Sequence, residues 1–126
     1  MSQKPIEAQL PVGRAGPNSD ALAPDESEIR FIIDHRHAAR QASLVEVTVP
    51  AGQVSRPVWH RTVEEIWYIL EGHGQVWRCP PAQAAGTVDP VPVEPGDALV
   101  IPTGWRFQFS AGEDAPLRLL CYTSPR

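Results

Sequence analysis

Short runs of alternating apolar and polar residues fill the chain from Glu28 onward. In SLVEVTV (43–49) and EEIWYILE (64–71) the period is two, which is typical of strands with one buried face. Similar runs follow one another, separated by Gly, Pro or polar residues. They are EIRFII (28–33), RPVWH (56–60), GQVWR (74–78), WRFQFSA (105–111) and PLRLLCY (116–122), and TVDPVPVEPGDALVIPTG (87–104) adds a strand, a turn and a strand.

About eight to ten short strands with turn residues between them are typical of a β-sandwich or barrel. The pattern therefore predicts an all-β fold, an antiparallel β-barrel or jelly roll. The Gly-bracketed sequence Gly72-His73-Gly74 predicts a turn of hairpin type. Only residues 35–42 and parts of the N-terminal segment are expected to contain helix.

The first 27 residues have a different texture. They are rich in Pro and Ala and poor in large apolar side chains, and such a segment cannot bury enough surface to fold alone. Pro11, Pro17 and Pro24 also exclude a long helix there. We predict an extended N-terminal arm over 1–27 and one barrel domain over 28–126.

Composition narrows the function classes. The net charge is −4, and the Lys and Arg residues form no basic stripe, so we expect no nucleic-acid partner. No apolar run approaches the roughly 20 residues that span a bilayer, so we expect no membrane partner. Cys79 and Cys121 form no CxxC pair, and no signal peptide is evident. These features predict a cytoplasmic protein with reduced thiols.

Two spaced motifs carry the strongest signal. In the first, Gly52 is followed by five residues, Val58, Trp59, His60, four residues, Glu65, six residues and Gly72. In the second, GDALVIPTGWRF, the fixed residues are Gly96, Pro102 and Gly104, and Phe107 and Ala111 follow. The pair resembles the two motifs of the cupin superfamily, G-x5-H-x-H-x3,4-E-x6-G and G-x5-P-x-G-x2-H-x3-N. The resemblance spans about residues 28–123. The run HRTVEEIWYILEG (60–72) is similar to the corresponding run of small single-domain bacterial cupins.

The resemblance implies a divalent metal held by three His and one Glu, but this chain departs from that set. Val58 stands at the first His position and Phe107 at the last, and neither offers a lone pair. Only His60 and Glu65 remain, whereas catalytic metal sites normally keep three protein ligands. We expect no cofactor, with weak divalent-metal binding through His60 and Glu65 as the most the site offers.

Other residues could supply missing ligands. A bulge could turn Arg106 or Gln108 inward, but arginine cannot bind a metal and glutamine is a weak ligand. The pair His35 and His37 lies in a polar connection, and His73 lies between two glycines. We expect solvent positions for these three histidines.

Strand alternation places Val58 and His60 on one face, Glu65 and Trp67 on one face, and Phe107 and Phe109 on one face. The predicted ligand pocket is walled by Val58, Trp67, Phe107, Phe109 and Tyr122, with Arg106 at its mouth. The same aromatic side chains could instead fill the barrel, because small barrels are often packed solid.

Three functions fit these residues. The first is binding of a small organic ligand in the barrel. The second is a metal-independent isomerase, epimerase or cyclase in which His60 and Glu65 act as acid and base, for which some cupins look like precedents. The third is a metalloenzyme with a sparse site.

Assembly is predicted from outward-facing apolar residues. Trp59, Ile66, Tyr68 and Leu70 alternate with residues that already point inward, and Trp59 and Trp77 are expected to face outward. We therefore expect a homodimer that covers a sheet face or edge.

Overall fold

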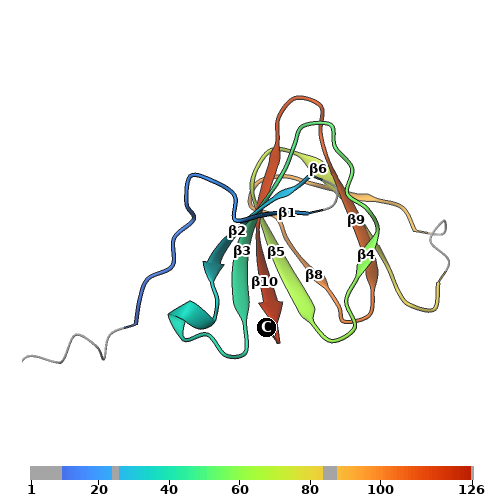
Figure 1. The fold of residues 1–126 in the computed structure, drawn as a ribbon. Coiled ribbons are helices and arrows are strands. Elements are labelled where there is room, and N and C mark those ends of the chain that lie inside the picture. The colour runs from blue at the N-terminus through green and yellow to red at the C-terminus, as the bar shows by residue number, and fades with distance from the viewer. Residues whose placement is uncertain (1–9, 24–25, 84–87, 126) are drawn as a thin grey trace, which may run out of the picture.

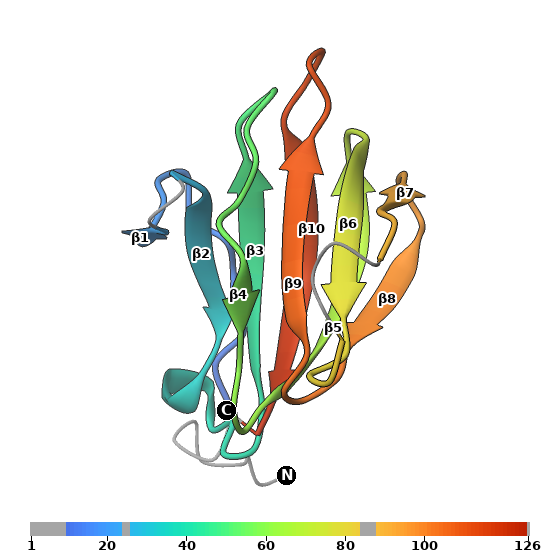
Figure 2. The same cartoon turned by 90° about the vertical axis from the view of Figure 1, so that its right-hand side faces the viewer.

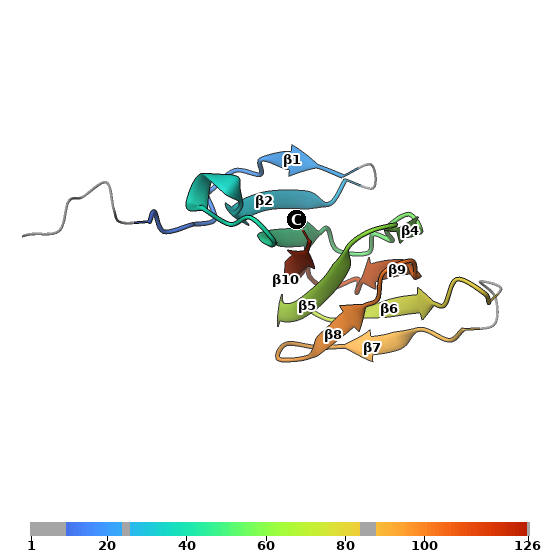
Figure 3. The same cartoon turned by 90° about the horizontal axis from the view of Figure 1, so that it is seen from below.

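Two antiparallel sheets form the molecule in the computed structural model, which describes residues 10–23, 26–83 and 88–125. Figure 1 shows the ribbon, and Figures 2 and 3 show the sheets as two layers. The larger sheet contains, in spatial order, β1 (Ala21–Leu22), β2 (Glu28–Ile33), β3 (Ser43–Val49), β10 (Leu117–Ser124), β5 (Glu64–Glu71) and β8 (Ala98–Ile101). The smaller contains β4 (Val58–Trp59), β9 (Arg106–Ala111), β6 (Gly74–Cys79) and β7 (Val91–Val93).

The predicted all-β jelly roll is confirmed by these pairings. On β5, residues at every second position from Glu65 to Ile69 are buried, and those between them are exposed. The inward side chains of both sheets meet in one core, as expected for strands with period-two patterning. Its members are Val47, Val49, Trp67, Ile69, Val76, Val93, Ile101, Phe107, Ala111, Leu117, Leu119 and Cys121.

The turn at Gly72 differs from the prediction. It does not close a hairpin, because β5 belongs to the larger sheet and β6 to the smaller one. The chain instead crosses between the layers at this point. Gly72 has φ of 82°, and a methyl group there would lie 2.2 Å from the carbonyl oxygen of Pro116. Glycine is needed both for the backbone conformation and for this close approach.

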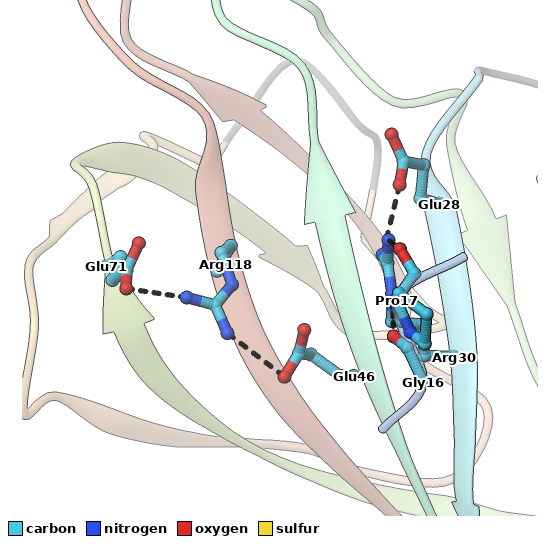
Figure 4. Close-up of polar contacts among 7 residues, drawn as sticks. All are labelled: Gly16, Pro17, Glu28, Arg30, Glu46, Glu71 and Arg118. Carbon is cyan, nitrogen blue, oxygen red and sulfur yellow. Dashed lines mark hydrogen bonds and ion pairs between the residues drawn. The ribbon is translucent and has the colours of Figure 1, made fainter. Parts of the chain in front are cut away.

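Part of the predicted arm belongs to the larger sheet. Ala21 and Leu22 form β1, which pairs with β2 at the sheet edge. The Asp20 carboxylate accepts a hydrogen bond from the Phe31 amide at 2.8 Å, and Arg30 donates to the carbonyls of Gly16 and Pro17 (Figure 4). The arm prediction therefore missed an edge strand, since two residues are too few to produce a pattern. Residues 1–9, 24 and 25 lie outside the described residues.

Helix is limited, within the described residues, to one 3₁₀ turn, η2 (His35–His37). This turn falls inside the segment where helix was expected. Across the residues that the structure describes, no helix is long and apolar enough to cross a membrane.

Candidate functional site

A cavity of about 330 Å³ lies between the two sheets. Both sheets contribute to it, and most of its wall is apolar. The described residues that line it are Ala23, Ser27, Ile29, Val45, Val47, Ser55, Arg56, Val58, His60, Glu65, Trp67, Phe107, Phe109, Leu119, Cys121 and Thr123. Its volume falls within the range of about 300–1,000 Å³ that small-molecule sites occupy.

His60 and Glu65 meet at this cavity. His60 Nε2 lies 3.1 Å from Glu65 Oε2. Glu65 points inward because it is the second residue of β5, whose inward positions alternate. His60 follows β4, and its carbonyl accepts a hydrogen bond from the Gly104 amide at 2.8 Å. Gly104, at φ 85°, makes the turn that allows this contact. The two motifs are thus joined through the backbone at the site itself.

The second oxygen of Glu65 is also occupied. Glu65 Oε1 accepts a hydrogen bond from Trp67 Nε1 at 2.9 Å, and Glu65 is only 8% exposed. Burial has the largest effect on Glu65 and raises its pKa, but the hydrogen bonds from His60 and Trp67 outweigh it, so its pKa lies below the ordinary value. The hydrogen bond with Glu65 raises the pKa of His60, while partial burial opposes this. Both shifts favour an imidazolium–carboxylate pair.

Aromatic rings form the wall beside this pair. The Trp67 ring meets Phe107 and Phe109 edge to face, with centroids 5.4 and 5.0 Å away, and the His60 ring lies 5.6 Å from Phe107. Val58 and Phe107 are direct partners in the β4–β9 ladder. The two apolar replacements of the motifs are therefore neighbours, and together they make one side of the cavity apolar.

The donor set does not fit the metal that the resemblance implies. Among the described residues that line this cavity, only His60 and Glu65 offer imidazole or carboxylate ligand atoms, and they bond to each other. Among the described residues no group of three or more His, Cys, Asp or Glu side chains is arranged to hold a metal ion.

Two of the predicted pocket residues are placed elsewhere, and these predictions were wrong. Tyr122 is 41% exposed on the outer face of β10, because its neighbour Cys121 is an inward residue. Arg106 lies beside the inward Phe107 and so faces outward. Its guanidinium donates to the Gln83 carbonyl at 2.7 Å and contacts Cys79 Sγ. The remaining residues predicted for the pocket, Val58, Trp67, Phe107 and Phe109, all line the cavity, and their role in holding a ligand stays a prediction.

The possible substitute ligands are also away from the cavity. Gln108 faces outward and donates to the Ser55 carbonyl at 2.8 Å, and the β6–β9 register is continuous, without a bulge. The solvent position expected for His37 was wrong, because its side chain is only 14% exposed and its Nδ1 accepts a hydrogen bond from the Asp34 amide at the start of η2. His73 is exposed in the turn between the sheets.

Several cavity residues were not identified from the sequence. Arg56 is the most notable, because it precedes Val58 and His60 by two and four residues in an extended segment and shares their face. Period-two alternation, applied two residues further back, would have found it. Ala23 and Ser27 come from the predicted arm, and no sequence signal indicated that this arm reaches the cavity.

Cys121 also lines the cavity, but it is poorly suited to be a nucleophile. Burial and the neighbouring Glu65 carboxylate raise the pKa of its thiol to about 12. Since the thiolate is the reactive form, the thiol stays protonated and unreactive at neutral pH.

A second, more open groove of about 490 Å³ lies on the other side of the smaller sheet. Outward-facing side chains line it, including Gln75, Trp77, Arg106 and Gln108. Neither His60 nor Glu65 takes part in it, so the titratable pair belongs to the inner cavity alone.

A family model described as a cupin domain matches residues 45–123. The chain belongs to the cupin family. The match includes His60, Glu65, Val58 and Phe107, and therefore both replaced positions.

Known proteins extend this picture without specifying a function. An uncharacterized protein of Methanocaldococcus jannaschii is 34% identical over 85 residues, which cover 66% of this chain and 60% of that protein. The structure of a predicted oxalate decarboxylase from Thermotoga maritima superposes with a TM-score of 0.73 at 17% identity, covering 91% of this chain and 99% of the other. KdgF from Halomonas sp. gives 0.67 at 21% identity, covering 85% and 86%. At these identities the two structures support the fold alone.

Proposed function

We propose that this cupin binds a small, largely apolar organic molecule inside the barrel, with a polar group of the ligand directed to His60. The observation that carries the proposal is the cavity of about 330 Å³, with aromatic and aliphatic walls and one hydrogen-bonded polar pair. Few polar groups in an apolar concavity are the usual composition of a small-molecule site. His60 keeps 37% of its side chain exposed, which leaves it accessible to a ligand.

The metal site of the family is, in this proposal, degenerate. Val58 and Phe107 occupy two ligand positions and lie opposite each other on β4 and β9. The double substitution Val58→His with Phe107→His should restore four donors and create zinc or manganese affinity that the natural chain lacks. Equilibrium dialysis with each metal measures this. Tight stoichiometric metal binding to the unsubstituted protein through His60 and Glu65 would contradict it.

Acid–base catalysis without metal is the second candidate, and the 3.1 Å contact between His60 and Glu65 favours it. The raised pKa of His60 makes its imidazolium a proton donor near neutral pH, while Glu65 orients the ring. An isomerase, epimerase or cyclase could use this pair. Turnover of a bound ligand that is lost in His60→Gln, with binding retained, would distinguish catalysis from binding.

Ligand-observed NMR with a library of small apolar molecules tests the binding proposal. Hits should compete for one site, and in protein-observed spectra they should shift the Trp67 indole signal, because that N–H donates to Glu65 at the cavity. His60→Ala should weaken binding by about tenfold or more, while far-UV circular dichroism stays unchanged.

Two further variants locate the site. Val58→Trp should fill the cavity and abolish binding, whereas the matched control Tyr122→Ala, on the outer face, should leave it unchanged. Binding that survives Val58→Trp would place the functional surface elsewhere, such as the groove beside Trp77, and would overturn the proposal.

A further inference from the structure

Arg56 lies at the cavity, and its guanidinium stabilises the fold through no hydrogen bond or ion pair with a described residue. It lines the cavity wall and is exposed to solvent. Within residues 10–23, 26–83 and 88–125, its guanidinium makes no hydrogen bond or ion pair. Its position in an extended segment, on the same face as Val58 and His60, keeps it beside the apolar wall.

Other arginines of the described chain have partners. Arg30 pairs with Glu28, Arg36 with Asp34, and Arg118 with Glu71 and Glu46. Arg61, only five residues from Arg56, lies over the Trp59 ring at 5.7 Å. Arg56 therefore differs from these residues in combining a cavity position with a free guanidinium.

The described side chains that line the cavity carry an excess of positive charge. Among the described residues that line it, Glu65 is the only acidic one, and it is already compensated by His60. Arg56 adds a positive charge that none of these described lining residues balances. A cavity with apolar walls and one uncompensated cation at its rim favours a molecule with an apolar body and one negative charge.

We propose that Arg56 binds the carboxylate of an amphipathic monocarboxylic acid whose apolar body lies against Val58 and Phe107. The planar guanidinium can hold a carboxylate through two parallel hydrogen bonds. A single cation balances a single negative charge, which favours a monocarboxylate over a phosphate dianion. This inference rests on the proposed function and gives it a ligand class.

His60 is less suited than Arg56 to hold the carboxylate. His60 Nε2 already lies 3.1 Å from Glu65 Oε2, so its positive charge is compensated by that carboxylate. The carboxylate of the ligand therefore belongs at Arg56. The side chain of His60, which is 37% exposed, remains accessible to another polar group of the ligand.

Matched pairs of probes test the role of charge. We would use 4-phenylbutanoate with 4-phenylbutanamide, and octanoate with octanamide, because each pair differs in charge but hardly in shape. Isothermal titration should show that the unsubstituted protein binds each carboxylate about tenfold more tightly than its amide. Arg56→Met should erase that preference by weakening carboxylate binding about tenfold more than amide binding. Arg56→Lys should retain only part of it, because lysine is a point charge without the planar fork.

Arg61→Met is the control, since it removes a nearby exposed arginine that does not line the cavity. It should leave the preference intact. If the unsubstituted protein binds amides as well as carboxylates, or if Arg56→Met keeps the preference, the role of Arg56 is overturned while ligand binding stands. If neither member of any pair binds, both the role of Arg56 and the proposed function fail. The comparison within the unsubstituted protein decides this even where a variant is unstable.

Discussion

The two faces of β5 and β10 use the same strands for different purposes. The inward face carries Glu65, Trp67 and Ile69 from β5, with Leu119 and Cys121 from β10, and all five are buried. The outward face carries apolar side chains that remain about half exposed, together with charged ones. Ile66, Tyr68 and Tyr122 are 44%, 46% and 41% exposed.

Polar pairs show the difference most clearly. Inside, the Glu65 carboxylate is almost fully desolvated, and both its oxygens have partners. Outside, Arg118 binds Glu71 and Glu46 across three strands (Figure 4). The Glu71 side chain is 63% exposed, whereas that of Glu46 is only 12% exposed. Water screens and competes for the contact with Glu71, whereas removal of an inner partner leaves a buried group unpaired. The Arg118–Glu71 pair should therefore contribute less to stability than the pair at Glu65.

The largest expected effect compares two isoleucines of β5. Ile69→Ala should lower the free energy of unfolding by about 2–5 kcal/mol, because Ile69 is 0% exposed and the lost side chain leaves a cavity. Ile66→Ala, on the outer face, should cost under about 0.5 kcal/mol in the isolated chain. Urea unfolding at low protein concentration measures both. Equal losses would contradict the inward assignment of alternate β5 positions.

The next effect compares the two kinds of ion pair. Glu65→Ala should cost about 1–3 kcal/mol, since it leaves the buried Trp67 indole N–H without its acceptor. Glu71→Ala removes only the exposed partner of Arg118 and should cost about 0–1 kcal/mol. The same unfolding measurements apply, with Glu65→Gln as the variant that keeps an acceptor for Trp67. If Glu71→Ala costs more than Glu65→Ala, the outer pair contributes more than its exposure suggests.

The inner pair should also make stability depend on pH. The pKa of His60 is raised above 6.5, so its contribution is complete below that value and is lost as pH rises through the folded-state pKa. The pKa of Glu65 is lowered below 4.5, so its contribution is complete above that value and is lost as pH falls through the folded-state pKa. The pair should stabilise the folded protein most between pH 4.5 and pH 6.5.

His60→Gln supplies the reference for this prediction. Its deficit in unfolding free energy should be largest in that window and should shrink as pH rises through the folded-state pKa of His60. NMR titration of the His60 ring gives the folded-state pKa directly. A value at or below 6.5 would contradict the assignment.

Substitutions on the outer face should have the smallest effect on the free energy of unfolding. They should act instead on the mass of the assembly in solution. Trp59, Ile66 and Tyr68, predicted to lie in a homodimer interface, are exposed, while Leu70 is only partly so. The homodimer stays a prediction. Tyr68→Arg should leave the unfolding free energy within about 0.5 kcal/mol at low concentration but abolish the dimer in sedimentation velocity. A monomer at every concentration in the unsubstituted protein would rule the dimer out.

Strand positions and the inner pair could be predicted because both depend on short-range pattern. Period-two alternation placed Glu65 and Trp67 on one face and Phe107 and Phe109 on another, and the motif spacing joined them at His60. Tyr122 failed because its aromatic character suggested a pocket, whereas the inward position of Cys121 turns it outward. Arg106 failed for the same reason beside Phe107.

Three features followed from the sequence alone, because they depend on residue type and alternation. They are the all-β fold, the inward-facing residues of β5 and β9, and the apolar side chains of Val58 and Phe107 at two motif positions. The tertiary structure added that the turn at Gly72 joins different sheets, that Ala23 and Ser27 reach the cavity, and that Arg56 lies beside it with no partner among the described residues. Such features depend on which distant segments pack together. The packing of distant segments depends on the burial of both sheets together, so a local sequence pattern does not predict it.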